Sequence, residues 1–372
     1  MKLKCVYMRG GTSKAVFFHQ CDLPEDRTLW PEIFLRVMGT PDPKQIDGMG
    51  GAAQITSKIA VISPADDPSY DVNYTFFQIG VDAPVVDDRV NCGNISCAVG
   101  PFAVDEGLVP AREPVTVVRV LNTNTGKFIE EHVPVRDGRA LTVGDARIHG
   151  VPGTGAGMDV FFERPGGATT GRLLPTGNAR DILHPVGYAP IEATLIDCSN
   201  PVVILRAADL GLRGGEIEPF RSDRALLDHI EAIRCQAAVA FGFVDRAELA
   251  TERSLARPKV AVIAPAQDFT SSDGATVPGE AMDLCSRVVS VGAFHKTHPI
   301  TSGIALAAAA SIGGTLAREL VRPGWDGGTL RIGHPFGTLE IKIVMDGQEV
   351  LKAGTVRTAR RIMDGTVYVE LE

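Results

Sequence analysis

Alternating apolar and polar residues predict β-strands in both halves of the chain. In the first half, residues 77–82 alternate, and the segments 115–120 and 128–135 flank a polar turn at 122–126, which is typical of a hairpin. The second half has the same texture, with predicted strands at 202–205, 259–263, 339–344, 350–351 and 366–371. Many short strands favour a sheet-rich fold over a helical bundle.

Helical spacing of apolar residues predicts two amphipathic helices. The first covers residues 29–37 and stops at Gly39. The second covers residues 222–240, with Ser222 or Asp223 as its N-cap.

Two other segments, 92–104 and 301–312, carry no charged residue and predict buried helices, because a helix that is apolar all round has no face for water. Pro101 should kink the first of them, since proline removes a backbone donor. Each segment lies among predicted strands, one in each half of the chain. We therefore expect an α+β fold with two similar halves, each a sheet wrapped around a central helix.

The boundary between the halves is predicted after the Gly- and Pro-rich stretch 165–178. The N-terminal half would be residues 1–184, with its central helix starting near Cys92. The C-terminal half would be residues 185–372, with its central helix starting near Ser302, although the last strand is free to return to the first half. A length of 372 residues agrees with two domains of about 150 residues or more each.

The charge and the cysteines narrow the class of protein. A net charge of -8 argues against nucleic acid or an anionic membrane as a partner. No apolar run approaches the roughly 18 residues of a membrane span, and the first residues lack the apolar core of a signal peptide. The seven cysteines form no CxxC pair and no zinc spacing, which favours reduced thiols and no metal. We expect a cytoplasmic protein, and the sequence leaves a homo-oligomer open.

The starts of the two uncharged helices are candidate anion sites. The first N–H groups of a buried helix need partners, and an anion can provide them. The segments 91–94 and 301–303 leave these groups open, and across a domain cleft they would bind two carboxylates. The alternative is ordinary N-capping by Asn91 and Thr301.

Lys58 and Cys92 are candidates for proton transfer. Lys58 enters an apolar run at 59–62, and burial there would lower its pKa and make it a base. Its alternative is a lysine at the mouth of a strand, with its ammonium group in water. Cys92 lies at a helix start, which favours a reactive thiolate. Its alternative is a small buried hydrophobic residue.

Further cations could bind an anionic ligand. His295, Lys296 and His298 precede the second uncharged helix and could add positive charge, but no acidic or Cys residue nearby completes a metal site. A Gly-rich turn near the N-terminus could hold a carboxylate, and its spacing is not that of a phosphate P-loop. This turn consists of Arg9, Gly10, Gly11, Thr12, Ser13 and Lys14.

Several segments together resemble the PrpF family, in order along nearly the whole chain. They are residues 8–14, 45–51, 56–58, 91–94, 99–103, 174–178, 264–272 and 333–335. The family includes 2-methylaconitate cis-trans isomerase, 4-oxalomesaconate tautomerase and methylitaconate isomerase. The resemblance implies the diaminopimelate epimerase-like fold, with two pseudo-symmetric halves around central helices, in agreement with the two-helix pattern.

The resemblance also implies roles for particular residues. The residues at the positions of Lys58 and Cys92 are the acid and base of the family. The predicted substrate-binding residues are Arg9, Gly10, Gly11, Thr12, Ser13, Lys14, Ser57, Asn91, Gly93, Asn94, Asn178, His295, Thr301, Ser302 and Gly303.

Four positions depart from the family pattern or from the pattern of its relatives. Ala15 replaces a usual glycine, and Phe336 replaces a usual serine, which removes one candidate hydrogen bond to substrate. The related amino-acid racemases have a second cysteine where this chain has Thr301 and Ser302. A racemase with two thiols is therefore disfavoured.

The resulting hypothesis is a cofactor-independent isomerase or tautomerase. It would shift a proton on an unsaturated di- or tricarboxylic acid such as 2-methylaconitate or 4-oxalomesaconate. Lys58 would remove the proton, helix-start amides would hold the enolate-like charge, and Cys92 would supply a second proton. Two alternatives stay open: an amino-acid epimerase or racemase, and a non-catalytic accessory protein for an iron–sulfur hydratase.

Overall fold

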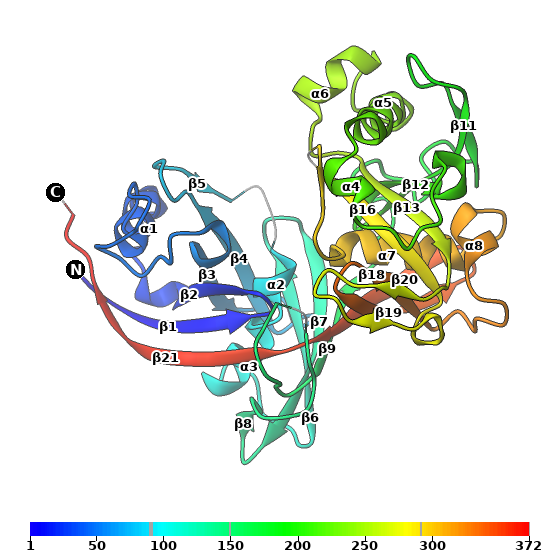
Figure 1. The fold of residues 1–372 in the computed structure, drawn as a ribbon. Coiled ribbons are helices and arrows are strands. Elements are labelled where there is room, and N and C mark those ends of the chain that lie inside the picture. The colour runs from blue at the N-terminus through cyan, green and yellow to red at the C-terminus, as the bar shows by residue number, and fades with distance from the viewer. Residues whose placement is uncertain (89–91, 149, 291, 372) are drawn as a thin grey trace. The chain divides into compact units, whose positions relative to one another are not determined.

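The computed structural model describes residues 1–88, 92–148, 150–290 and 292–371 and divides into two compact units (Figure 1). Unit 1 comprises Met1–Phe162 and Val356–Glu372, and unit 2 comprises Glu163–Thr355. The last strand therefore belongs to the first unit.

The division between the units lies earlier than the expected boundary after residue 184. The Gly-rich segment that follows Glu163 packs inside unit 2, because the Asp197 carboxylate accepts hydrogen bonds from the backbone N–H groups of Thr169 and Thr170 at 2.8 and 2.6 Å. A Gly- and Pro-rich composition looks like a linker in the sequence, but here one buried carboxylate orders the turn.

Unit 1 contains one mixed sheet in the order β21-β1-β2-β3-β4-β6-β7-β9. The pairs β2–β3 and β4–β6 are parallel and the others are antiparallel, and β6 and β7 form the expected hairpin. The strands are β1 (Lys2–Gly10), β2 (Ser13–His19), β3 (Lys58–Pro64), β4 (Val72–Ile79), β5 (Val86–Asp87), β6 (Val115–Asn122), β7 (Lys127–Arg136), β8 (Arg139–Ala140), β9 (Met158–Glu163) and β21 (Ala359–Tyr368).

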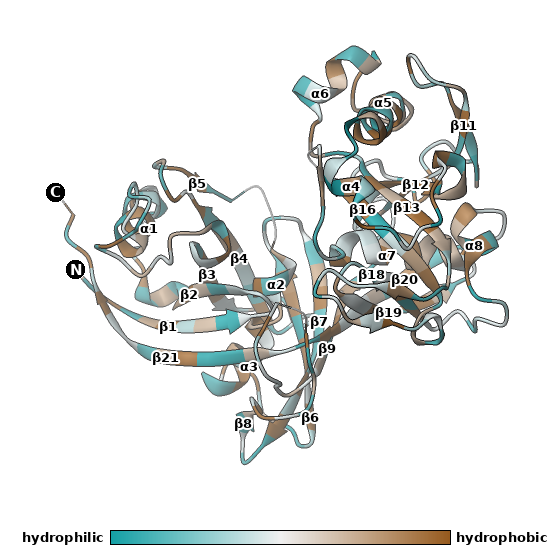
Figure 2. Cartoon of the chain, viewed as in Figure 1, coloured by the Kyte–Doolittle hydropathy of each residue, from teal (hydrophilic) through white to brown (hydrophobic). Residues whose placement is uncertain are grey.

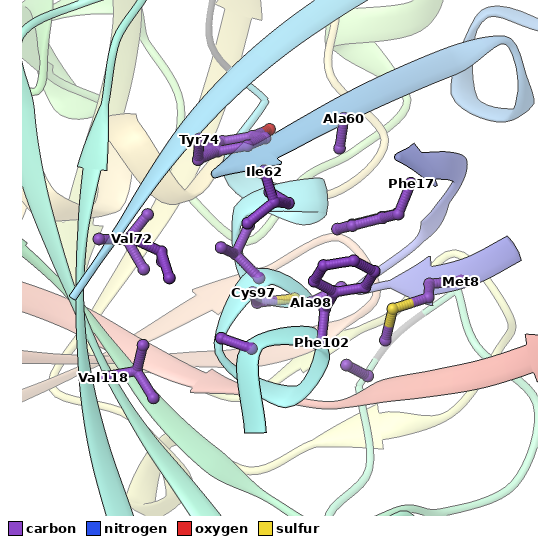
Figure 3. Close-up of a cluster of buried hydrophobic side chains, with 14 of the residues drawn as sticks. Met8, Phe17, Ala60, Ile62, Val72, Tyr74, Cys97, Ala98, Phe102 and Val118 are labelled. Carbon is purple, nitrogen blue, oxygen red and sulfur yellow. The ribbon is translucent and has the colours of Figure 1, made fainter. Parts of the chain in front are cut away.

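The central segment of unit 1 is two short helices, α2 (Gly93–Ser96) and α3 (Val99–Asp105), both packed in the core. Figure 3 shows Cys97, Ala98 and Phe102 among side chains of the surrounding strands. The interruption lies before Pro101, not at it as expected. Pro101 is in the first turn of α3, where the backbone donor that proline lacks has no intrahelical partner.

Strand β3 is buried on both faces, and the contacts of its other side chains show on which face Lys58 lies. Ala60 and Ile62 pack with the central helices, whereas Ile59 and Val61 pack with α1 (Trp30–Met38) on the other face. Because side chains alternate along a strand, Lys58 lies on the face of the central helices. Helix α1 matches its predicted range and ends at Gly39, whose φ of 74° suits glycine.

Unit 2 contains a second mixed sheet, in the order β10-β11-β12-β13-β16-β18-β19-β20. Its strands are β10 (Asp181–Leu183), β11 (Ile191–Cys198), β12 (Asn200–Arg206), β13 (Lys259–Pro265), β16 (Leu284–Ser290), β17 (Ala293–Phe294), β18 (Thr329–His334), β19 (Gly337–Asp346) and β20 (Glu349–Arg357), and β14 (Phe269–Thr270) pairs separately with β15 (Thr276–Val277).

Helices cover both faces of the unit 2 sheet. Helix α5 (Arg224–Ala240) has a hydrophilic and a hydrophobic side (Figure 2), and Asp223 caps it by accepting a hydrogen bond from the Leu226 N–H. The buried helix α7 (Ile300–Ser311) packs against β11, β12 and β19. The remaining helices are α4 (Pro219–Ser222), α6 (Ala250–Arg253) and α8 (Leu316–Leu320).

The two units repeat one order of elements. In unit 1, β2 is parallel to β3, β3 is antiparallel to β4, and β4 is parallel to β6. In unit 2, the strands β12, β13, β16 and β18 have the same relations. The amphipathic helix precedes the second strand of each series, and the buried helix precedes the fourth. The prediction of an α+β fold with two similar halves is confirmed. Among the described residues, no helix has the length and apolar character that a bilayer crossing requires.

Candidate active site

Lys58 is a buried lysine at the first position of β3. Its side chain is 6% exposed, so the alternative of an ammonium group in water is wrong. Its Nζ donates a hydrogen bond to Gln78 Oε1 on the neighbouring strand β4 and lies 5.1 Å from the centre of the Phe76 ring. Burial lowers the pKa of Lys58 below its ordinary value of 10.5, and Cys92 partly offsets this through its charge and a side-chain hydrogen bond.

Gln78 is a site residue that the sequence interpretation missed. Its Nε2 donates to the backbone carbonyls of Gln54 and Ser57 at 3.1 and 3.0 Å, which leaves Oε1 turned toward Lys58. The signal was present, because Gln78 is a polar residue in an apolar part of β4. Gln78 thus fixes the position of the Lys58 amine.

Cys92 is the N-cap residue of α2 and is half-buried against the core of unit 1. No described side chain caps α2, so its first N–H groups are not used by a capping hydrogen bond within the described part of the chain. Asn91, the expected cap, lies outside the described residues. The structure therefore brings together a buried amine and a thiol at the start of the central helices.

The Gly-rich turn after β1 packs directly on α2. The Asn94 side chain accepts a hydrogen bond from the Thr12 N–H at 3.4 Å, and its Nδ2 donates to Thr12 Oγ1 at 3.1 Å. A side-chain Cβ at Gly10 would lie 2.4 Å from the Asn94 carbonyl oxygen, and one at Gly11 would lie 2.3 Å from Asn94 Oδ1. Thr12 and Asn94 therefore join the turn to the helix, and the two glycines allow the close approach.

The two cations of this turn have partners in the fold. Arg9 Nη1 donates to the backbone carbonyls of Gly11 and Thr358, both at 2.9 Å, and so ties the turn to the start of β21. Lys14 Nζ lies 5.4 Å from the centre of the Tyr7 ring, which packs with the α1 cluster. Lys14 is therefore on the opposite face of the sheet from Lys58.

Other predicted binding residues of unit 1 also have roles in the fold. The Ser57 hydroxyl is fully buried and lies within hydrogen-bond distance of two acceptors, Gln45 Oε1 at 2.8 Å and the Ala53 carbonyl at 2.9 Å. Ser13 is buried in the β1–β2 hairpin opposite Gly10. Among the described residues, a Cβ at Gly93 would meet only the Phe162 ring, at 3.5 Å.

The remaining predicted residues belong to unit 2. Thr301, Ser302 and Gly303 form the first turn of α7, whose N-cap is Pro299, so the interpretation of Thr301 as the cap is wrong. Ser302 is fully buried, and its Oγ has no hydrogen-bond partner among the described residues. Asn178 is an exposed turn residue whose Nδ2 donates to Asp181 at 2.8 Å.

The histidines before α7 do not provide the expected positive charge. Burial lowers the pKa of His298 to about 3 and also lowers the pKa of His295. Both imidazoles are therefore mainly neutral at pH 7. Their hydrogen bonds stay within the segment and its sheet: His295 contacts the Thr297 carbonyl at 2.7 Å, and His298 contacts Ser286 Oγ at 3.1 Å.

A buried carboxyl group lies behind the start of α3. Glu131 on β7 is fully buried and accepts a hydrogen bond from the Gly100 N–H at 3.0 Å, and its Oε1 has no partner among the described residues. Burial raises the pKa of Glu131 well above its ordinary value of 4.5, which favours the neutral carboxyl group. Burial also raises the pKa of its neighbour Cys97 to about 12, so this thiol stays protonated at pH 7.

Replacement of Glu131 by Gln should make folding stability less sensitive to pH. The folded-state pKa of Glu131 is raised, so the wild-type protein loses stability as the pH rises from about 4.5 toward that pKa, whereas Gln cannot ionise. The folding equilibrium of Glu131→Gln should improve relative to wild type by about tenfold per pH unit in this window. Denaturant unfolding at several pH values measures it, with Glu25→Gln as an exposed control. A difference that does not vary with pH would contradict a raised pKa of Glu131.

No arrangement of three or more His, Cys, Asp or Glu side chains suited to a metal ion occurs among the described residues. At the start of the central helices of unit 1, the amine of Lys58 and the thiol of Cys92 are close enough to share a hydrogen bond.

Comparison with known proteins extends this description to the whole chain. The model of a family described as "PrpF protein" matches residues 1–370. The chain is 42% identical to a 3-methylitaconate isomerase of Eubacterium barkeri, with 100% of this chain and 98% of the relative covered. It is 39% identical to a 2-methyl-aconitate isomerase of Shewanella oneidensis, with 99% and 97% covered. The crystal structure of a methylitaconate-delta-isomerase superposes with a TM-score of 0.95 at 41% identity, covering 100% of this chain and 96% of that one.

Proposed function

We propose that this chain, which belongs to the PrpF family, moves a proton between two carbons of an unsaturated di- or tricarboxylic acid without a cofactor. The match of the family model to residues 1–370 confirms the resemblance that the sequence motifs indicated. The relatives that match along the whole chain are named isomerases, and this chain is an isomerase as well.

The observation that carries the proposal is the pairing of the buried Lys58 with the half-buried Cys92. A lysine in water is protonated at pH 7 and cannot accept a proton from carbon. Burial lowers the pKa of Lys58 and so raises the fraction of neutral amine. The hydrogen bond to Gln78 fixes the amine in one place. A general base needs this combination of a shifted pKa and a fixed position.

The proposed reaction has two proton steps. The Lys58 amine takes a proton from the allylic carbon, and the electrons of that C–H bond move into the conjugated double bond and carboxylate. A proton then returns to the other end of the allylic system, where a new C–H bond forms and the double bond has moved. Lys58 as the ammonium ion, or the Cys92 thiol, supplies this proton. When Cys92 supplies it, the Lys58 ammonium group reprotonates the thiolate.

The names of two relatives and the chemistry of the reaction support the proposed substrate class. The two relatives described above are named for 3-methylitaconate and 2-methyl-aconitate, both unsaturated polycarboxylic acids. The reaction also needs a carbon acid whose anion is stabilised by conjugation, because a lysine is a weak base toward carbon. We therefore propose one of these acids or 4-oxalomesaconate as the substrate.

Incubation in D₂O followed by proton NMR tests this function. Each of 2-methylaconitate, methylitaconate, 4-oxalomesaconate and aconitate is incubated separately with the enzyme. We expect one acid to isomerise, with deuterium entering its allylic carbon. Incubation of the same acid without enzyme provides the background rate. Neither isomerisation nor exchange with any of the four would contradict the proposal.

A further inference from the structure

One face of strand β4 carries three large side chains, two of which contact the amine of Lys58. Gln78 accepts the hydrogen bond from Lys58 Nζ, and the Phe76 ring centre lies 5.1 Å from that nitrogen. Two-residue spacing puts Tyr74 on the same face, and Tyr74 packs in the core around the central helices of unit 1 (Figure 3). Tyr74 is thus the next side chain along the face that holds the base.

The Tyr74 hydroxyl is a buried polar group that lacks a hydrogen-bond partner. The side chain has no exposed surface, and its Oη forms no hydrogen bond of normal geometry with any residue that the structure describes. A buried hydroxyl in this state costs free energy, because it has lost its hydrogen bonds with water. Such a group in a well-packed core calls for an explanation other than packing.

The Cys92 thiol is a near neighbour of this hydroxyl. Burial is the main reason that the pKa of Tyr74 lies well above its ordinary value of 10.0, and the charge of Cys92 is the second. Glu131 and Cys97 act in the same direction but more weakly. Cys92 also packs against the core cluster that contains Tyr74. The phenol therefore keeps its proton at pH 7 and is a hydrogen-bond donor beside the sulfur.

Ser96 is another neighbour of the phenol, but it does not take up the phenol proton. The Ser96 hydroxyl is close enough to offset part of the raised pKa of Tyr74, although the two oxygens do not reach normal hydrogen-bond geometry. Ser96 Oγ donates instead to the Cys92 carbonyl, at 3.0 Å. Ser96 thus fixes the backbone of Cys92 and leaves the Tyr74 proton for another acceptor.

We propose that Tyr74 is a positioning residue that donates a hydrogen bond to the Cys92 sulfur when this sulfur is a thiolate. The assignment rests on the proposed function, in which Cys92 gives its proton to the substrate carbon and remains a thiolate until the Lys58 ammonium group reprotonates it. A phenol hydrogen bond stabilises that charge, and Tyr74 keeps its own proton throughout. A neutral thiol is only a weak acceptor, which explains why the hydroxyl has no partner before the reaction.

Replacement of Tyr74 by Phe tests this assignment on the thiol itself. The rate of Cys92 alkylation by iodoacetamide is measured as a function of pH, without substrate, by mass spectrometry of the peptide that contains Cys92. Only the thiolate reacts. Loss of a charge-assisted hydrogen bond should therefore move the midpoint of this profile up by about one pH unit and lower the rate at pH 7 about tenfold. Alkylation of the exposed Cys21 in the same samples should not change.

Initial rates and a matched variant complete the test. Tyr74→Phe should lower kcat about tenfold and leave KM nearly unchanged, because the hydroxyl acts on the sulfur and not on the substrate. The control is Tyr70→Phe, which removes a hydroxyl that donates to Asn73 Oδ1 at 3.0 Å. Asn73 lies on the opposite face of β4 from Tyr74, so this variant should keep the wild-type alkylation profile and kcat.

Three results would overturn the assignment. An unchanged Cys92 profile in Tyr74→Phe would remove the hydroxyl from the thiolate, and a shifted profile with unchanged kcat would remove it from the reaction. Denaturant unfolding should show equal or greater stability, since Phe keeps the ring and removes an unpaired polar group. A clear loss of stability would assign the hydroxyl to a hydrogen bond of the fold instead. Because alkylation needs no substrate, its result stands even if none of the four acids is isomerised.

Discussion

Replacing Lys58 by Met should abolish isomerisation while leaving the protein folded. The loss should be at least about 10²–10⁴-fold in kcat, the usual contribution of a positioned base. Methionine fills a similar volume and brings no buried charge, so the thermal unfolding midpoint should stay equal or rise. Deuterium exchange into the substrate should fall with turnover, because both need the same C–H bond to break.

Two further variants make the Lys58 result specific. Lys14→Met removes a lysine of the same β1–β3 region, but one that packs on the Tyr7 ring at the opposite face, and should retain activity. Lys58→Arg keeps a cation that cannot act as a base and should be as inactive as the methionine variant. An active Lys58→Arg would show that only the charge matters. Undiminished turnover of Lys58→Met would remove the residue from the mechanism altogether.

The wild-type pH profile provides an independent check on Lys58. The base must be neutral to accept a proton, so kcat/KM should rise with pH through the lowered pKa of Lys58. The pH at the midpoint of this rise should lie below 10.5, the ordinary pKa of lysine.

Replacing Gly10 by Ala should impair both stability and catalysis. The new Cβ would lie 2.4 Å from the Asn94 carbonyl oxygen and 3.1 Å from Ile95 Cα, and both are backbone atoms of α2. Because no flexible side chain can move aside, α2 must shift away from β1. Overpacking of this kind costs about 1–3 kcal/mol. Displacement of α2 also moves Cys92, its N-cap residue, relative to Lys58 on the sheet.

Denaturant unfolding and initial rates measure the two effects of Gly10→Ala. The matched control is Gly313→Ala, because a Cβ there would meet no atom of the described part of the chain within 4 Å and the backbone is not left-handed. We expect the control to match wild type in stability and rate. If Gly10→Ala keeps wild-type stability and turnover, α2 tolerates the added Cβ. The packing at Gly10 then does not determine the position of Cys92.

Hydrophobic pattern identified most of the elements, because each follows from local spacing. The β6–β7 hairpin, α1 and α5 with its Asp223 cap lie close to their predicted positions. The sequence analysis predicted a kink at Pro101 and not the start of α3. Proline is compatible with the first turn of a helix as well as with a kink inside one. The unit boundary was misplaced for a different reason: the hydrogen bonds of Asp197 to the Gly-rich turn join residues far apart in sequence.

The candidate site was predictable in its residues but not in their partners. Lys58 and Cys92 stand out because a lysine in an apolar run and a thiol at a helix start are unusual. The motifs do not reveal whether a polar side chain faces a ligand or its own backbone. Ser57 and Asn94 bind neighbouring segments of the fold, and Lys14 lies on the other face of the sheet. Glu131 was detectable in principle, since two-residue spacing places it on the same face of β7 as the apolar residues Ile129 and Val133.

The return of β21 to unit 1 has a consequence for synthesis on the ribosome. Strand β21 pairs with β1 along nearly its full length. The residue just before β21 is Thr358, whose carbonyl accepts the hydrogen bond from Arg9. During translation all of unit 2 emerges between these two partners. Until then β1 has one open edge, a position prone to pairing with other chains. The unit that carries Lys58 is therefore the first to be made and the last to be completed.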